Sequence, residues 1–222
     1  MTLGAPTASG DFPVGQVFEP GIHRVRPVGP NALVVQGLEA AHLGPLSFVA
    51  DGVVVIRGVS GSGKTLLLRA LADLDPHRGR VSLGPMDQTE MSAPEWRRRV
   101  GYLPAESAWW HATPKPHFGA KTGHWWRALG LSDDRLEVSI DRLSSGERQR
   151  LALARLLDLA PSALLLDEPD AHLDPESATR LRETIRTWAA RRNATVLWVA
   201  HGLGPGRGAP ELLLERGTWV KP

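Results

Sequence analysis

Short apolar runs alternate with helix-forming segments along most of the chain. Each run holds four to six residues, many of them Val, Ile or Leu, and the segments between are rich in Leu, Ala, Arg and Glu. Such runs predict strands buried on both faces, and strands that alternate with helices predict a parallel α/β sheet. We expect strands at 53–56, 100–104, 163–166 and 195–200, and helices at 66–72, 145–159 and 176–192.

The N-terminal part and the end of the chain show a different pattern. Residues 1–30 hold many Pro and Gly without sustained periodicity, so we expect a poorly ordered arm with one short strand over 22–25. The remaining residues, 31–222, are expected to form a single domain. Further strands are expected in that domain at 33–35, 46–49 and 80–84, with a hairpin at Arg216-Gly217.

Residues 105–143 interrupt the α/β pattern. They are rich in Trp and His, and Pro114 and Pro116 lie close together. Two prolines at this spacing disfavour a continuous helix, so we expect an irregular-to-helical insert.

The amino-acid composition limits the classes of protein to which this chain can belong. Of 222 residues, 42% are hydrophobic and 23% charged, which is ordinary for a globular protein with one sizeable core. The formal charge of +2 is too small to indicate a nucleic-acid partner. The absence of Cys excludes disulfides, thiolate metal sites and cysteine nucleophiles. No apolar stretch approaches the ~18 residues that span a bilayer and no secretory signal is evident, so we expect any membrane role to come through a separate chain.

The segment Gly58-Val59-Ser60-Gly61-Ser62-Gly63-Lys64-Thr65 carries the most specific chemistry, because it is a complete phosphate-binding loop between a strand and a helix. Glycines let the backbone turn inward, so that N–H groups point at a β-phosphate at the positive end of the following helix. Lys64 would reach the β- and γ-phosphate oxygens, and the Thr65 hydroxyl would hold Mg²⁺. The nucleotide-binding residues expected here are Gly58, Ser60, Gly61, Ser62, Gly63, Lys64 and Thr65.

A pair of acidic residues follows the apolar run at 163–166. Ligands of open α/β sheets bind at the carboxyl ends of the strands, so Asp167 could hold Mg²⁺ from the side opposite Thr65. Glu168 could polarise the water that attacks a γ-phosphate. Alone, such a pair could equally cap the next element; the phosphate loop upstream favours the catalytic interpretation.

The segment Leu143-Ser144-Ser145-Gly146-Glu147 opens a predicted helix with a small, hydroxyl-rich N-terminus. Exposed N–H groups and serine hydroxyls at such an end can bind an anion. Taken alone, a Ser cap followed by Glu is more often a plain helix start.

Together these motifs resemble the nucleotide-binding domain of ATP-binding cassette (ABC) proteins. The resemblance covers roughly residues 31–217 and rests on the segments 58–65, 100–104, 143–147, 164–169, 171–174 and 199–201. It implies a P-loop NTPase (RecA-like) parallel sheet, a small antiparallel β subdomain, and a helical insert that carries the signature at about 105–160.

The same resemblance implies a dimer that sandwiches two ATP molecules. Ser144 and Gly146 of one subunit would touch the γ-phosphate bound by the other, with Asp174 at the dimer seam. His201 would contact the γ-phosphate and hold the attacking water, so the implied catalytic residues are Glu168, His201 and Lys64. Alone, a strand-end histidine is more often structural.

Three positions depart from the family pattern. Ala105 stands where the family usually has a glutamine that approaches Mg²⁺ and the attacking water. Either Glu106 substitutes as an oxygen ligand, or hydrolysis and its coupling to transport are altered. Ser145 replaces a signature glycine. The aromatic residue that stacks on adenine has no clear counterpart here other than His42.

The aromatic residues of the insert allow two interpretations. Trp109-Trp110 and Trp125-Trp126 could form the groove that receives a helix of a membrane protein, or they could pack the insert's own core. His111, His117 and His124 could suggest a metal site, although no acidic or Cys ligand lies nearby in sequence. The run Arg97-Arg98-Arg99 is typical of a solvated face.

We therefore expect an ATPase that uses ATP and Mg²⁺: the cytoplasmic subunit of a transporter, peripheral on the inner face of the membrane through a separate permease, with no nucleic-acid partner. One alternative is a non-transport ABC ATPase acting on ribosomes or chromosomes, which a single cassette without a coiled coil disfavours. The other is a regulatory module that holds ATP without turnover, which Ala105 favours and Glu168 and His201 disfavour.

Overall fold

The parallel sheet expected from the sequence is present. The computed structural model describes residues 16–19, 22–27, 29–119, 125–200, 204 and 209–220. In spatial order, the six strands of the main sheet are β12 (Thr218–Val220), β11 (Glu211–Glu215), β5 (Val53–Arg57), β10 (Thr195–Val199), β9 (Ala163–Asp167) and β8 (Val100–Leu103). All neighbours run parallel except β12, which pairs antiparallel with β11 through the turn at Arg216-Gly217.

The central strands are buried on both faces, as their continuous apolar runs predict. Every residue of β9 and β10 is buried. Because side chains alternate between faces, Leu165 and Leu197 enter one hydrophobic core, whereas Leu164, Leu166 and Trp198 enter another. Two layers of other elements must therefore cover this sheet.

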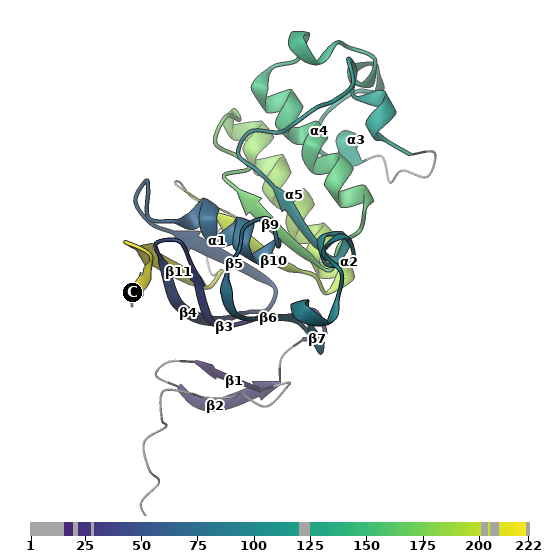
Figure 1. Ribbon diagram of the computed structural model, residues 1–222. Coiled ribbons are helices and arrows are strands. Elements are labelled where there is room, and N and C mark those ends of the chain that lie inside the picture. The colour runs from purple at the N-terminus through teal and green to yellow at the C-terminus, as the bar shows by residue number, and fades with distance from the viewer. Residues whose placement is uncertain are drawn as a thin grey trace, which may run out of the picture.

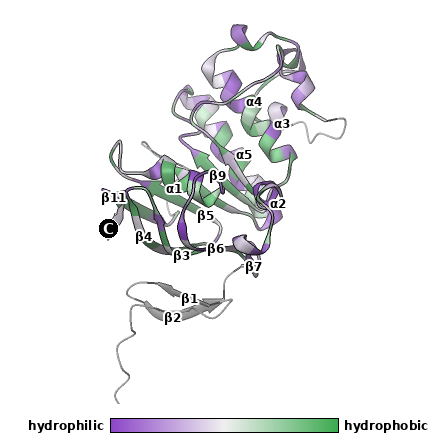
Figure 2. Cartoon of the chain, in the orientation of Figure 1, coloured by the Kyte–Doolittle hydropathy of each residue, from purple (hydrophilic) through white to green (hydrophobic). Residues whose placement is uncertain are grey.

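The first covering layer is α1 (Lys64–Leu71) together with a second sheet. This sheet is antiparallel and consists, in order, of β4 (Leu43–Ala50), β3 (Leu33–Ala40), β6 (Arg78–Leu83) and β7 (Met86–Asp87). Leu67, Leu68 and Leu71 of α1 are fully buried in the core shared by the two sheets. Figure 2 shows the hydrophobic residues concentrated along α1 and the central strands. This is the small antiparallel subdomain that the family resemblance implies.

The opposite face of the parallel sheet is covered by α4 (Ser145–Asp158) and α5 (Pro175–Arg192), visible in Figure 1. Leu151 and Leu153 of α4 and Ile185 and Trp188 of α5 are buried in the core on this side. Both helices lie within one or two residues of the ranges expected from the sequence.

In its described residues, 105–119 and 125–143, the insert expected over 105–143 is irregular to helical. Its regular elements are short: η2 (Lys115–His117), α3 (Trp125–Ala128), η3 (Asp133–Leu136) and η4 (Ile140–Arg142). The insert and α4 form the end of the molecule farthest from β1 and β2 in Figure 1. Trp126 is buried and its indole N–H donates to Asp133 at 2.9 Å, so this tryptophan packs the insert's own core.

One helix of the domain was not anticipated from its sequence. The helix α2 (Ala93–Arg99) follows the 3-10 turn η1 (Gln88–Glu90). A capping box joins Ser92 and Glu95 at its start, and Trp96 is fully buried with its indole N–H donating to Leu71 O at 2.8 Å. The Ser-x-x-Glu pattern is the sequence signal that indicates the start of this helix. The run 97–99 ends this helix and is exposed, as expected.

The N-terminal arm contains a hairpin. The strand expected over 22–25 lies within β2 (Ile22–Pro27), and it pairs antiparallel with β1 (Gln16–Glu19), which had not been expected. The other residues of the arm before Gly29 lie outside the described part of the chain.

Candidate functional site

The phosphate loop lies between β5 and α1, at the carboxyl end of the parallel sheet. The loop occupies residues 58–63, and α1 begins at Lys64. The N-terminus of α1 has no side-chain cap and no acidic residue in its first turn. The positive end of this helix dipole is therefore left for an anion from outside the helix.

Two glycines make this loop possible. Gly58 has φ of 156° and Gly63 has φ of 101°, both in the region that favours glycine. A side chain at Gly58 would collide with the Leu214 carbonyl, and one at Gly63 would collide with the Leu43 side chain. The loop is therefore built tightly against β11 and the start of β4.

Lys64 folds back over the loop. Its Nζ donates to the carbonyl oxygens of Gly58 at 2.8 Å and Val59 at 2.9 Å, and the residue is 6% exposed. The ammonium group is thus held above the loop by groups that offer only partial negative charge. Phosphate oxygens would be stronger acceptors for it.

Thr65 and Asp167, 102 residues apart in sequence, are brought into direct contact. The Thr65 hydroxyl donates to Asp167 Oδ2 at 2.7 Å. Both residues lie at strand or helix ends on the same edge of the sheet, because β9 ends at Asp167 and α1 begins beside it. A hydroxyl and a carboxylate oxygen are ligands that Mg²⁺ accepts together with phosphate oxygens.

The electrostatics around Asp167 favour a cation. Asp167 is 2% exposed, and burial raises the pKa of its carboxyl group, with a further increase from neighbouring Glu168. Hydrogen bonds from Thr65 and Tyr102 and the charge of Lys64 oppose that shift. The Tyr102 hydroxyl lies 3.5 Å from Asp167 Oδ2, and burial and the carboxylate raise the pKa of this phenol. Tyr102 is not among the residues that the sequence predicts to hold the metal.

Glu168 has an unusual backbone conformation. Its φ is 49°, in the left-handed region that costs a non-glycine residue about 1–2 kcal/mol. Its N–H donates to Val199 O at 3.2 Å, which joins the end of β9 to the end of β10. Strained residues often lie at functional sites, where the surrounding structure enforces them. His201, expected to act beside Glu168, lies outside the described residues.

The signature segment caps α4. Ser144 Oγ accepts the Glu147 N–H at 3.1 Å, and the Glu147 carboxylate accepts the Ser144 N–H at 2.9 Å. Burial alone would raise the pKa of Glu147, but these bonds from Ser144 and the charges of Arg135 and Arg150 hold it below its usual value. A side-chain hydrogen bond from Ser144 to the Glu147 carboxylate also lowers that pKa, so the hydroxyl proton of Ser144 is used within the cap.

Gly146 allows the signature helix to pack closely on the loop before α5. A methyl group at Gly146 would lie 2.8 Å from Leu173 Cδ2. Asp174, in the same loop, accepts the Ser177 N–H at 2.9 Å and thereby caps α5, which lowers the pKa of its carboxyl group. Among the described residues, no hydrogen bond or ion pair joins segment 143–147 to the phosphate loop.

The strand that leads to Ala105 is tied to the signature helix. Gln149, which is 6% exposed, donates from Nε2 to the Pro104 carbonyl at 2.9 Å. Ala105 is half-buried and Glu106 is exposed. His42 lies in the turn between β3 and β4, with Nε2 3.3 Å from the position a Gly63 methyl group would take. It is therefore near the start of α1, where we expect a nucleotide base to lie.

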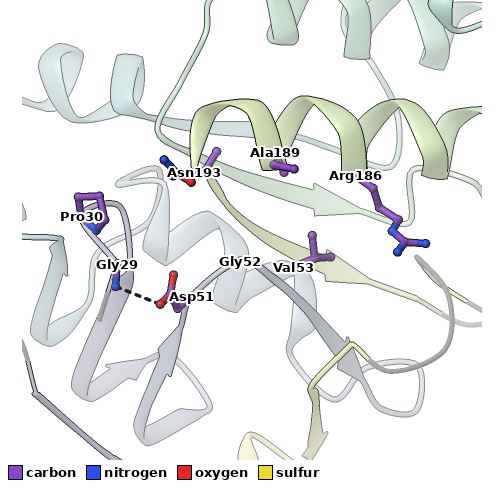
Figure 3. Close-up of a pocket in the computed structure, with 10 residues that line it drawn as sticks. Gly29, Pro30, Asp51, Gly52, Val53, Arg186, Ala189 and Asn193 are labelled. Carbon is purple, nitrogen blue, oxygen red and sulfur yellow. Dashed lines mark hydrogen bonds between the residues drawn. The ribbon is translucent and has the colours of Figure 1, made fainter. Parts of the chain in front are cut away.

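A pocket of about 350 Å³ lies at the opposite edge of the sheet (Figure 3). Its walls include Gly52 and Val53 at the start of β5, Ala194 before β10, and Asp51, which accepts the Gly29 N–H at 3.0 Å. None of the residues predicted to bind nucleotide or metal lines it. The chemistry expected from the sequence is therefore not located in this pocket.

The described part of the chain contains neither a cluster of metal ligands nor a helix that could span a membrane. No group of three or more His, Cys, Asp or Glu side chains there could hold a metal ion, and of the three insert histidines His124 lies outside that part. None of the described helices is both long and apolar enough to cross a membrane.

Comparisons with known proteins point to one family. Residues 45–171 match the family model described as ABC transporter. The molybdate/tungstate import ATP-binding protein WtpC of Thermococcus kodakarensis is 34% identical over 163 residues, which cover 66% of this chain and 48% of that protein. The sulfate/thiosulfate import ATP-binding protein CysA of Mycobacterium tuberculosis is 36% identical over 155 residues, covering 63% and 42%. The chain thus spans about half the length of these relatives.

Solved structures share the fold. An ATP-binding subunit of an ABC transporter superposes with a TM-score of 0.75 at 22% identity, covering 84% of this chain and 87% of that one. A dimeric ATP-binding cassette in a post-hydrolysis state, bound to ADP and Pi, superposes with a TM-score of 0.73 at 20% identity. The superposition covers 85% of this chain and 97% of that one.

Proposed function

This chain belongs to the ABC transporter family, and from that premise we propose that it is the ATP-binding and ATP-hydrolysing subunit of a transporter. The observation that carries the proposal is the Thr65–Asp167 contact at the mouth of the phosphate loop, with Glu168 next in sequence. Independent segments of the chain supply these groups, and their convergence fits one reaction, phosphoryl transfer from a nucleoside triphosphate to water.

The chemistry of the site fits ATP with Mg²⁺. The phosphate loop offers glycine and serine N–H groups, the N-terminus of α1 and the Lys64 ammonium to a triphosphate. Thr65 and Asp167 would hold the metal. When bound, Mg²⁺ supplies positive charge to the β- and γ-phosphate oxygens.

Glu168 would orient and polarise a water molecule in line with the γ-phosphorus. The water oxygen bonds to phosphorus as the bond to the bridging oxygen breaks, so that the products are ADP, inorganic phosphate and one proton. Lys64 would leave the loop carbonyls and bind γ-phosphate oxygens, and His201 would help to place the water.

We propose that two copies of the chain form the complete site. Ser144 is exposed at the N-terminus of α4, where the N–H groups of the first turn, including that of Gly146, have no acceptor within the helix. Because no hydrogen bond or ion pair joins this segment to the phosphate loop among the described residues of one copy, we assign the segment to the γ-phosphate held by a second copy.

The membrane partner would be a separate permease, which would place this subunit on the inner face of the cell membrane. Trp110 is 68% exposed, whereas Trp109 and Trp125 are half-buried and Trp126 is buried. Trp126 thus serves the insert's own core, and Trp110 supports an interface, because exposed tryptophans often anchor protein contacts. The formal charge of +2 is too small to favour a nucleic-acid partner. The names of relatives concern import of oxyanions or iron by those proteins.

The test is phosphate release from ATP by the purified chain, combined with its mass in ATP. Glu168→Gln should keep ATP and accumulate as a dimer, because the closed state forms but hydrolysis cannot reset it. The double variant Glu168→Gln with Ser144→Glu should remain a monomer, because a carboxylate would face the partner's γ-phosphate. If both variants have the same mass in ATP, the sandwich arrangement is wrong.

A regulatory module that binds ATP without turnover is the second candidate, and Ala105 favours it. Ala105 offers no oxygen where a glutamine would approach the metal and the water. We favour retained binding with slower or differently coupled hydrolysis. ATP binding without phosphate release at high protein concentration would favour the regulatory function instead.

A further inference from the structure

The phenol of Tyr102 lies beside the expected metal ligand Asp167 without a role in the chemistry proposed above. Tyr102 is on β8 and pairs in register with Leu165 of β9. Because alternate residues of a strand share a face, Leu165 and Asp167 point to the same side of the sheet. The Tyr102 ring packs against the core on that side, and its hydroxyl reaches along β9 to Asp167. The register of the two strands therefore places this hydroxyl at the metal site.

Two hydroxyl groups converge on a single oxygen atom of Asp167. Thr65 donates to Oδ2 at 2.7 Å, and Tyr102 donates to the same atom over the longer distance of 3.5 Å. No side chain or backbone N–H of the described residues donates to Oδ1. A carboxylate has about four lone-pair positions on its two oxygens, so donors fixed on one oxygen set the rotation of the whole group. The two hydroxyls thus leave Oδ1 available to a ligand.

The orientation of Asp167 depends on these donors. Groups behind a metal ligand fix its orientation, and their loss weakens metal binding. Asp167 is 2% exposed, so little solvent reaches it to supply other hydrogen bonds. Of residues 100–105, Tyr102 alone has a polar side chain, and Ala105 offers no oxygen. The phenol is therefore the one polar side-chain group that this strand and its following residues bring to the site.

We propose that Tyr102 is a positioning residue for the metal: its hydroxyl, together with that of Thr65, holds Asp167 Oδ2, so that Oδ1 is presented to Mg²⁺ bound with ATP. The inference rests on the proposed function, because it concerns the same site. Tyr102 contacts neither the metal nor the nucleotide and acts through Asp167. Removing its hydroxyl therefore weakens the binding of Mg²⁺ and leaves the binding of metal-free nucleotide unchanged.

The first experiment measures the affinity of the full chain for a non-hydrolysable ATP analogue while the concentration of free Mg²⁺ is varied. Tyr102→Phe keeps the ring and its packing and removes only the hydroxyl. We expect the Mg²⁺ concentration at half-maximal binding to rise about tenfold. This is the lower end of the usual effect of a group behind a metal ligand, because the contact is long. In EDTA, the variant and the parent should bind the analogue equally.

Thr195→Val is the matched control for the loss of a hydroxyl. The Thr195 hydroxyl is fully buried and donates to Asn31 O at 2.6 Å, at the opposite end of the same sheet. This variant loses a buried hydrogen bond, so its thermal midpoint should fall. Its Mg²⁺ dependence should match that of the parent, which separates the positioning role from a general loss of stability.

A second background tests whether Tyr102 acts through Asp167. Asp167→Asn should itself raise the Mg²⁺ requirement, and adding Tyr102→Phe to it should change that requirement no further. Tyr102 is the only tyrosine of the chain, so fluorotyrosine-labelled protein gives a single fluorine NMR signal. This signal should shift when Mg²⁺ is added to the parent with bound analogue, and should shift much less in Asp167→Asn.

A parental Mg²⁺ requirement in Tyr102→Phe would overturn the inference, as would an equal loss of analogue binding in EDTA or a further loss in the double variant. If Tyr102→Phe abolishes the response to Mg²⁺ as completely as Asp167→Asn does, the hydroxyl is itself a ligand and the positioning role is wrong. If the parent binds the analogue equally well with and without Mg²⁺, the proposed metal site fails as a whole, which is a different result.

Discussion

Replacing the buried carboxylate of Asp167 by an amide should stabilise the metal-free protein. Asp167 is 2% exposed and sits beside a second carboxylate, Glu168. The hydrogen bond that Thr65 donates to Asp167 is 2.7 Å long. As a bond to a charged group, it stabilises the folded protein by about 1.5–3 kcal/mol. Burying one ion costs several kcal/mol even after relaxation. The raised pKa of Asp167 indicates that this cost exceeds the gain.

Asp167→Asn removes the charge and keeps an oxygen acceptor for the Thr65 hydroxyl. We expect the free energy of unfolding to rise by about 1 kcal/mol. This is a typical gain when one destabilising feature of a functional site is removed. In a chain of this length, that gain raises the thermal midpoint by about 2–4 °C. The assay is thermal unfolding by circular dichroism in EDTA. Added ATP and Mg²⁺ should stabilise the parent strongly and the variant weakly, because only the parent retains the metal ligand.

Asp170→Asn is the matched control, three residues further along the chain in the turn after β9. The Asp170 carboxylate pairs with Arg182, whose Nη2 lies 2.5 Å from Oδ2, and both side chains are largely buried. Removing this charge leaves a buried arginine without its partner, so we expect a loss of about 2 kcal/mol and a midpoint about 4–8 °C lower. The same chemical change thus has opposite signs at the two positions. A midpoint of Asp167→Asn below that of the parent in EDTA would refute the reasoning.

Three further changes probe other parts of the site. Glu147→Ala should cost about 1 kcal/mol at pH 7 through its capping box. Because the pKa of Glu147 is lowered in the folded protein, this cost should decrease as the pH falls below 4.5, measured by urea unfolding at pH 7 and pH 3. Gly63→Ala should destabilise more than Gly52→Ala, because both have positive φ but only Gly63 meets the Leu43 side chain, and equal urea midpoints would contradict this. Ala105→Gln should raise phosphate release without changing ATP affinity, and an unchanged rate would mean that the site compensates fully.

The parts of the fold that follow from local pattern could be predicted from sequence. The buried strands around Leu165 and Val196 are continuous apolar runs, and the sheet that contains them is present with its helices on both faces. The helix at 93–99 was missed because Trp96 is its only fully buried residue, which leaves no apolar period to recognise. The capping box at the start of this helix was the only sequence signal that indicated it.

The site was predictable where residue type fixes chemistry, and less so where tertiary contact creates it. Sequence motifs selected Thr65 and Asp167, and the fold brings them within 2.7 Å. The partners that depend on packing, such as the Tyr102 hydroxyl and the bond from Gln149 to Pro104, carry no local signature. Nor does sequence spacing reveal that Arg155 lies between two tryptophans 45 and 46 positions earlier.

The most direct measurement of the central claim is the affinity of the Lys64→Ala variant for labelled ATP in the presence of Mg²⁺. Losing one charge-assisted contact to phosphate should weaken binding by roughly 10- to 100-fold. Lys115→Ala, which removes an exposed ammonium paired with Glu137, should leave the affinity unchanged. If Lys64→Ala binds ATP as tightly as the parent while remaining folded, the phosphate loop is not where this protein holds nucleotide.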